Sequence, residues 1–104
     1  MSDVFKALAD PTRREILLML TQQPTPVNAI AEKFNMSRPA VSKHIKLLES
    51  SGLVRIQPGE EDGRQRYCYA QLMALKEVEE YLQQLEKFWT TKLNHLGEYL
   101  NRTK

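Results

Sequence analysis

The chain has 104 residues and a mass of 12.1 kDa, which suits one domain with at most an appended element and excludes most large enzyme scaffolds. Its 41% hydrophobic and 27% charged residues are typical of a globular protein, and its longest apolar run, Ile16 to Leu20, is too short to span a membrane. The N-terminus does not resemble a signal peptide and the single cysteine cannot form an internal disulfide, so we expect a cytoplasmic protein.

The net charge of +2 does not by itself indicate a nucleic-acid partner, but its distribution is informative. Residues 33–75 hold seven basic and four acidic side chains, whereas residues 1–32 hold three and four and residues 76–104 hold five of each. The basic residues of the middle third fall in two clusters, separated by the acidic run of residues 60–62. Basic side chains on an exposed helix are often only solvated, so these clusters need support from other features.

The first part of the chain predicts two helices. Residues 4–8 have the spacing of a short amphipathic helix, which is expected to stop at Asp10 because the residue before a proline avoids the helical region. Asp10 as N-cap and Pro11 at the first helical position then begin a second helix, with a buried stripe within residues 16–20. Residues 21–26, which include two prolines, are predicted to form a loop.

Two further helices are predicted after this loop. Thr25 and Pro26 repeat the pattern of a cap followed by a proline, and they are expected to start a third helix over residues 27–34. After a tight connection, Ser37 is predicted to cap a fourth helix, which ends just before Gly52 because glycine accepts the left-handed conformation of a helix stop.

The periodicity changes after the fourth helix. Residues 53–56 favour a strand, residues 58–63 have turn chemistry, and residues 64–70 alternate as a second strand, so a β-hairpin is expected over about 53–70. From residue 72 to 101 apolar side chains recur at steps of three and four, which predicts one long helix. At about 1.5 Å per residue such a helix would be about 45 Å long, so part of its apolar face is expected to cover another chain.

The predicted order of four helices, a β-hairpin and a fifth helix is mainly α, and it is the order of a winged helix-turn-helix fold, with the helix-turn-helix at about 26–51. A helical wheel divides the fourth helix into two faces. The apolar face contains Ala40, Val41, Ile45, Leu47 and Leu48, with His44 beside them in a predicted packing or hydrogen-bonding role. The opposite face contains Arg38, Pro39, Ser42, Lys43, Lys46 and Ser50.

The opposite face has the chemistry that reads double-stranded DNA. Arg38 and Ser42 can hydrogen-bond to base edges in the major groove, while Lys43 and Lys46 can neutralise phosphates at the groove walls. Ser37 and the free N–H groups of the helix start offer a further phosphate site.

The hairpin is predicted to add a second DNA contact. Arg64, Gln65 and Arg66 lie beside a glycine-containing turn, where a loop can present cations to the backbone or the minor groove. The acidic tip at residues 60–62 would be repelled by phosphate, so we expect it to face solvent. The alternative is a hairpin that only adds solubility.

Three separated blocks of the sequence resemble a known family. They are Phe5–Leu17, Ile30–Phe34, and Met36–Glu49 with Ser51–Val54, and they are similar to the ArsR/SmtB family of bacterial repressors. The resemblance covers residues 4 to about 70 and is specific, because the blocks match in order and in spacing.

The resemblance implies a homodimeric winged-helix repressor that binds an inverted repeat in a promoter, with its first and last helices at the dimer interface. It places DNA contacts on Ser37, Arg38, Pro39, Ser42 and Lys43, the face that the wheel selects. We therefore expect a DNA-binding domain over residues 1–71 and a dimerisation helix over residues 72–104. The expected dimer contacts are Val4, Phe5, Leu8, Leu82, Leu85, Trp89, Leu93 and Leu96.

A metal site is not expected. Metal-sensing members of this family carry either a Cys-x-Cys motif, for which the third helix has no cysteine, or a two-part motif on the last helix. His95 and Glu98 have the spacing of half of that motif, but the partner positions are Leu82 and Gln84, which leaves a zinc ion with too few ligands. We predict no cofactor, and the effector stays open.

Other functions have weaker support. Cys68 is either a redox sensor or, as is more usual for a strand cysteine, a small buried hydrophobic residue. A winged-helix module that binds only proteins would favour a mixed or acidic face on the fourth helix, whereas that face has no carboxylate before Glu49. An enzyme is not expected, because the two histidines are far apart and no glycine-rich phosphate loop or nucleophile elbow is present.

Overall fold

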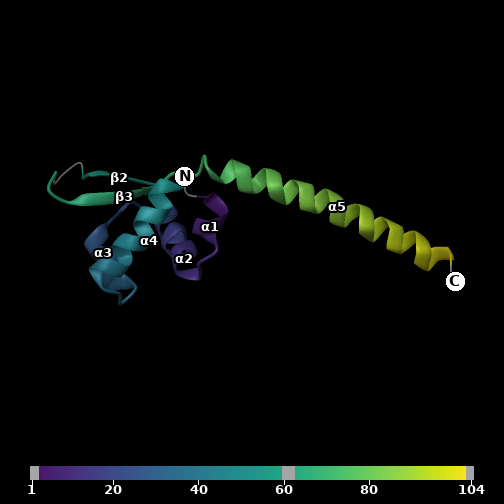
Figure 1. Cartoon of the computed structure of the whole chain (residues 1–104), viewed down its shortest axis with the longest axis horizontal. Helices are drawn as coiled ribbons and strands as arrows, with labels where there is room; N and C mark the ends of the chain where they lie inside the picture. Colours follow the sequence, from purple (N-terminus) through teal and green to yellow (C-terminus); the bar gives the residue numbers. More distant parts are fainter. Residues whose placement is uncertain (1–2, 60–62, 103–104) are drawn as a thin grey trace.

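A computed structural model describes residues 3–59 and 63–102, with the side chains of the last helix described up to His95. The molecule consists of a winged-helix body, residues 3–74, from which one long helix projects, and its extents are 69 × 25 × 25 Å (Figure 1). The elements are α1 (Val4–Leu8), α2 (Pro11–Gln22), β1 (Thr25–Pro26), α3 (Val27–Lys33), α4 (Arg38–Ser50), β2 (Val54–Pro58), β3 (Arg66–Ala70) and α5 (Leu75–Arg102). This order confirms the predicted winged helix-turn-helix fold.

Three helix boundaries follow the predicted local chemistry. The side chains of Asp10 and Ser37 each accept a hydrogen bond from the backbone N–H three residues further on, at 3.0 and 3.2 Å, which caps α2 and α4. Gly52 has φ +83°, the left-handed conformation expected at the stop of α4. Helix α2 runs to Gln22, two residues into the predicted loop, and α5 begins three residues later than expected, at Leu75.

The sheet contains one more strand than the sequence predicted. The antiparallel order is β1-β3-β2, and Thr25 of β1 lies opposite Cys68 in the central strand. The prediction that Thr25 caps α3 and that Pro26 is its first residue is therefore wrong. Pro26 is itself the N-cap, without a side-chain hydrogen bond, and a proline is tolerated in β1 because this is an edge strand.

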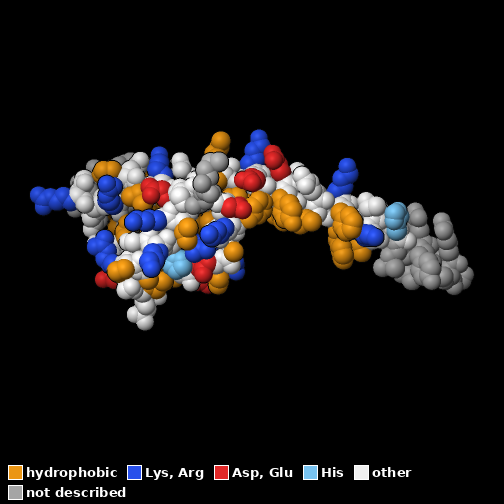
Figure 2. Space-filling model, in the orientation of Figure 1, with side chains coloured by type: hydrophobic (Ala, Val, Ile, Leu, Met, Phe, Trp, Pro, Cys, Tyr) orange, Lys and Arg blue, Asp and Glu red, His pale blue; other side chains and the backbone are white. Residues whose placement is uncertain are grey.

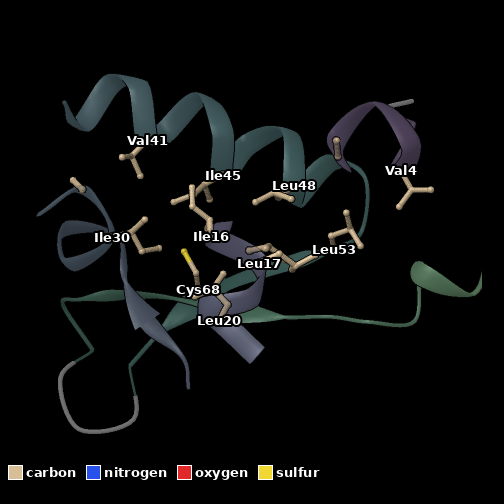
Figure 3. Packing of buried hydrophobic residues seen from close by; sticks show 13 residues of the cluster. Val4, Ile16, Leu17, Leu20, Ile30, Val41, Ile45, Leu48, Leu53 and Cys68 are labelled. Carbon is tan, nitrogen blue, oxygen red and sulfur yellow. The ribbon is translucent and has the colours of Figure 1, made fainter. Parts of the chain in front are cut away.

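The hydrophobic core lies between α4, α2 and the sheet (Figure 3). Val41, Ile45 and Leu48 of α4 are 0%, 2% and 0% exposed, which confirms the central part of the predicted apolar face. Ala40 and Leu47, at the margins of that face, are half-buried. The orientation of α4 is thus set by its buried side, and its opposite side must face outward.

Helix α5 leaves the body and extends beyond it (Figure 1). Its first turns pack on α1, where the rings of Phe5 and Tyr81 meet edge to face with centroids 5.3 Å apart. All described side chains from residue 81 to 95 are nevertheless exposed. In the described part of the chain, no helix is long and apolar enough to cross a membrane.

Candidate nucleic-acid interface

The exposed side of α4 carries the polar residues that the wheel selected. Arg38, Pro39, Lys43 and Lys46 are exposed and Ser42 is half-buried, while Ser37 is exposed at the helix start. Figure 2 shows Lys and Arg side chains gathered over the winged-helix body, whereas apolar side chains line the underside of the projecting helix. The winged-helix body and the described part of α5 therefore present different chemistry.

The fold brings α4 and the hairpin, here called the wing, into one concave surface. A hollow of about 330 Å³ is lined by Pro26, Val27, Asn28, Arg38, Arg64, Gln65 and Arg66. A second hollow of about 210 Å³ is lined by Val27, Arg38, Ser42, Ile45, Lys46, Glu49, Ile56 and Arg66. Arg38 and Arg66 line both hollows, so we treat them as one feature, the α4–wing groove.

The groove unites six of the nine predicted DNA-contact residues, although these residues are far apart in the sequence. They are Arg38, Ser42, Lys46, Arg64, Gln65 and Arg66. Ser37, Pro39 and Lys43 do not line it, but they are exposed on the first turns of the same helix. Arg64 and Gln65 belong to the turn before β3 rather than to the strand itself. The predicted solvent-facing tip at residues 60–62 lies outside the described residues.

The groove also has an acidic boundary. Glu49, near the end of α4, lines the second hollow beside Lys46 and Arg66. A carboxylate repels phosphate, so the positive part of the surface runs from the start of α4 to Lys46 and across to the wing. At the N-terminal end of α4 the helix dipole adds to the attraction of these cations for a polyanion.

Sequence reasoning missed one residue that lines this groove. Asn28 is exposed at the start of α3 and lines the groove, a position that depends on the docking of α3 against the wing and leaves no signal in the sequence. Arg55, a basic residue of the middle third of the chain, lines neither hollow: it is exposed on β2, and its guanidinium lies 4.9 Å from the centre of the Tyr69 ring.

The environment of Cys68 does not suit a redox sensor. The side chain is 0% exposed in the core, and burial, with the charge of Glu49 as a smaller cause, raises the pKa of the thiol to about 11. The thiolate is the reactive form of cysteine, so this environment suppresses reaction with oxidants. Cys68 therefore acts as a buried hydrophobic residue.

The half of a metal motif noted in the sequence lies only partly among the described side chains. Within those described side chains, no cluster of three His, Cys, Asp or Glu could hold a metal ion. His95 is exposed on α5, and the side chain of Glu98 lies outside the described part.

The predicted dimer residues divide into two groups. Phe5 and Leu8 are half-buried, whereas Leu82, Leu85, Trp89 and Leu93 are exposed, and the side chain of Leu96 lies outside the described part. Val4 does not belong with them, because it is 4% exposed and packs in the core of its own chain. A five-residue helix with its inner face in the core has only its outer residues to offer a partner.

Comparison with known proteins gives this geometry a family context. A family model described as a helix-turn-helix domain matches residues 8–57. The transcriptional repressor SdpR of Bacillus subtilis is 43% identical over 54 residues, which are 52% of this chain and 60% of that protein. The HTH-type transcriptional regulator Rv2034 of Mycobacterium tuberculosis is 33% identical over 97 residues, which cover 93% of this chain and 85% of the relative.

Solved structures agree with the sequence relatives. The crystal structure of an ArsR family transcriptional regulator has 37% identity and a TM-score of 0.72, over 83% of this chain and 86% of the other. A possible transcriptional regulator for arsenical resistance has 32% identity and a TM-score of 0.70, over 92% and 94%. The chain therefore belongs to the ArsR/SmtB family of winged helix-turn-helix transcriptional regulators, which bind DNA and are not enzymes.

Proposed function

We propose that this chain is a homodimeric transcriptional repressor that binds an inverted-repeat operator. The observation that carries the proposal is the α4–wing groove, in which cations from two elements face outward around the exposed side of α4. In this assignment residues 1–71 form the DNA-binding domain and residues 72–104 the dimerisation helix. One copy of the chain reads one half of the operator.

Helix α4 enters the major groove in this proposal. Arg38 and Ser42 lie on its first two turns and reach base edges, and an arginine fork suits guanine. Lys43 and Lys46 contact phosphates on the groove walls, while Ser37 and the positive end of the helix dipole attract another phosphate. Pro39 packs along the backbone beside them.

The wing contacts DNA on the flank of α4. Arg64, Gln65 and Arg66 line the same groove as Arg38, so a duplex seated on α4 also meets these side chains. Cations on a loop beside the recognition helix can contact the phosphate backbone or the narrow minor groove.

The dimer forms through α5 and the outer side of α1. Six exposed side chains make up the apolar stripe of α5, namely Tyr81, Leu82, Leu85, Phe88, Trp89 and Leu93, each between 45% and 62% exposed. Burying such a stripe against the same stripe of a second copy removes apolar area from water on both sides. The symmetry then places two copies of α4 on one face for the two half-sites of an inverted repeat.

Selection of duplexes from a random pool tests this function. The full-length protein should recover an inverted repeat with half-site centres about 34 Å apart, the distance of one DNA turn. Binding should weaken roughly 10³-fold to 10⁵-fold between 50 and 200 mM salt if each dimer neutralises six to ten phosphates. Recovery of unrelated sequences, or affinity that does not change with salt, would contradict the proposal.

A further inference from the structure

We propose that Arg13 and His44 form a positioning link that holds the recognition helix α4 in register with α1, and through α1 with the dimerising helix α5. The inference rests on the proposed function, because it assigns a role in operator recognition to two residues outside the α4–wing groove. Neither residue touches the surface assigned to DNA, so both act through the placement of α4.

The first half of the link ties α2 to α1. The Arg13 side chain donates from Nε to the carbonyl of Ala7 at 2.8 Å and from Nη2 to the carbonyl of Lys6 at 3.1 Å. These carbonyls belong to the last turn of α1, and that of Lys6 also accepts the backbone N–H of Ala9 at 3.2 Å. A planar guanidinium contacts both carbonyls at once and holds the end of α1 in one orientation.

The second half of the link reaches α4. The Arg13 Nη1 atom lies 3.2 Å from Nδ1 of His44, a half-buried residue between Lys43 and Ile45. Arginine carries only donors, so this contact is a hydrogen bond in the tautomer in which Nδ1 of His44 is the acceptor. One guanidinium thus contacts residues of α1 and α4 from its place on α2, and Arg13 and His44 are 31 residues apart in the sequence.

Asp10 fixes the position of Arg13. Its carboxylate caps α2 by accepting the backbone N–H of Arg13 at 3.0 Å, and it also lies 3.9 Å from Nδ1 of His44. The backbone hydrogen bond from Arg13 is the main cause that lowers the pKa of Asp10, and the charge of Arg13 acts in the same direction. The cap and the link therefore share one site at the junction of α1, α2 and α4.

The other end of α1 rests on α5. Phe5 of α1 meets Tyr81 of α5 with ring planes at 79°, so α1 lies between the projecting helix and the link. In a dimer built on α5, the orientation of α1 is set at the interface, and Arg13 and His44 pass this orientation to α4. Two recognition helices must fit half-sites about 34 Å apart, so a small rotation of α4 affects specific binding more than binding to random DNA.

The test compares variants of His44 and Arg13 on the selected operator and on a random duplex. His44→Leu removes the acceptor, whereas His44→Asn keeps an acceptor near the place of Nδ1. We expect His44→Leu and Arg13→Met each to weaken binding to the operator about tenfold. Each should weaken binding to the random duplex by less than about twofold. His44→Asn should restore operator binding to within about threefold of wild type, a rescue that requires the hydrogen bond rather than the ring.

Arg14→Met is the matched control. Arg14 also lies on α2 and donates to the end of α1, at the Leu8 carbonyl at 2.8 Å, but its recorded hydrogen bond does not extend to α4. Sedimentation confirms that each variant is a dimer before binding is compared. Operator binding by Arg14→Met should match wild type, and an equal loss in this variant would overturn the link.

A double variant and the salt response complete the test. Arg13→Met combined with His44→Leu should lose about tenfold, not a hundredfold, because both changes break the same contact. The slope of log affinity against log salt concentration should stay unchanged, whereas loss of a phosphate contact lowers its magnitude by about one. If His44→Leu does not fold, His44→Asn and Arg13→Met carry the comparison, and equal weakness of these two would overturn the proposal.

Failure of the link is distinguishable from failure of the proposed function. If wild-type protein does not prefer the selected operator over a random duplex, the DNA-binding assignment fails before any variant is compared. If wild type prefers the operator and His44→Leu and Arg13→Met bind as well as wild type, only the positioning link is wrong.

Discussion

The winged-helix body and the projecting helix α5 contain similar apolar residues but use them in opposite ways. In the body, Ile16, Ile30 and Leu48 are 0% exposed and form one core that α1 to β3 share. On α5, Leu85, Phe88 and Trp89 are 45%, 60% and 62% exposed. The body covers its own apolar side chains, whereas α5 leaves its apolar stripe exposed. The stability of the body and the proposed assembly through α5 can therefore be tested separately.

The largest expected effect is on the stability of the body. Leu48→Ala removes a fully buried side chain from the core and should lower the free energy of unfolding by about 3 kcal/mol. Urea unfolding at a fixed protein concentration measures this change. Leu18→Ala, at a position of α2 that is 67% exposed, is the control and should change stability by less than about 0.5 kcal/mol. Equal losses of unfolding free energy in Leu48→Ala and Leu18→Ala would contradict the distinction between a closed core and an exposed surface.

The next effect is on assembly. Leu85→Asp places a charge in the apolar stripe of α5 and should yield monomers, because a buried unpaired carboxylate is costly at a dimer interface. Operator affinity should fall about a hundredfold, since one recognition helix then binds without the other. Sedimentation and fluorescence anisotropy measure the two changes. Gln83→Asp, on the opposite side of α5, adds the same charge and should leave a dimer, and monomers from this control would contradict the assigned face.

A smaller effect is expected in the α4–wing groove. Arg38→Ala should cost about 1–3 kcal/mol and relax the preference at one base position. Lys46→Ala should weaken binding to all duplexes alike, and it should lower the magnitude of the salt slope by about one. Competition binding over a series of salt concentrations separates the two. Lys33→Ala removes an exposed cation that lines neither hollow of the groove, and it should bind like wild type.

The smallest effect concerns pH and the cap of α2. The pKa of Asp10 is lowered from its ordinary value of 3.8, chiefly by the backbone N–H of Arg13. A carboxyl with a lowered pKa stabilises the fold above its ordinary value, and this contribution disappears as the pH falls through the folded-state pKa. The stability difference between wild type and Asp10→Asn should therefore shrink from pH 5 to pH 3 in thermal unfolding. A constant difference would show that the charge of Asp10 is irrelevant.

Local chemistry explains how much of the fold could be predicted. The caps at Asp10 and Ser37 and the stop at Gly52 depend on residues within one turn, so the sequence was sufficient to find them. The short strand at Thr25 and Pro26 was missed because it exists only by pairing with β3, whose residues lie about 40 positions later. A threonine followed by a proline has the same local chemistry whether the two residues begin a helix or form a paired strand before it.

The candidate site follows the same division. The outward face of α4 was predictable because a helix with a buried side must expose the other. Three features were not predictable, because each needs two elements docked against one another. They are the shared hollow of Arg38 and Arg66, the place of Asn28 in its lining, and the contact of Arg13 with His44. Val4 was misplaced for a related reason, because an apolar residue on a short helix does not reveal which partner covers it.

The sequence by itself determined the winged-helix order, the cationic face of α4 and an apolar helix too long for one small body. These properties depend on periodicity, capping and composition, which act over a few residues. Tertiary structure alone decided which cations share a groove, that Cys68 is buried with a raised thiol pKa, and that one guanidinium connects α1 to the recognition helix. The physical reason is that hydrogen bonds and burial act over a few ångströms in space, whatever the separation in the chain.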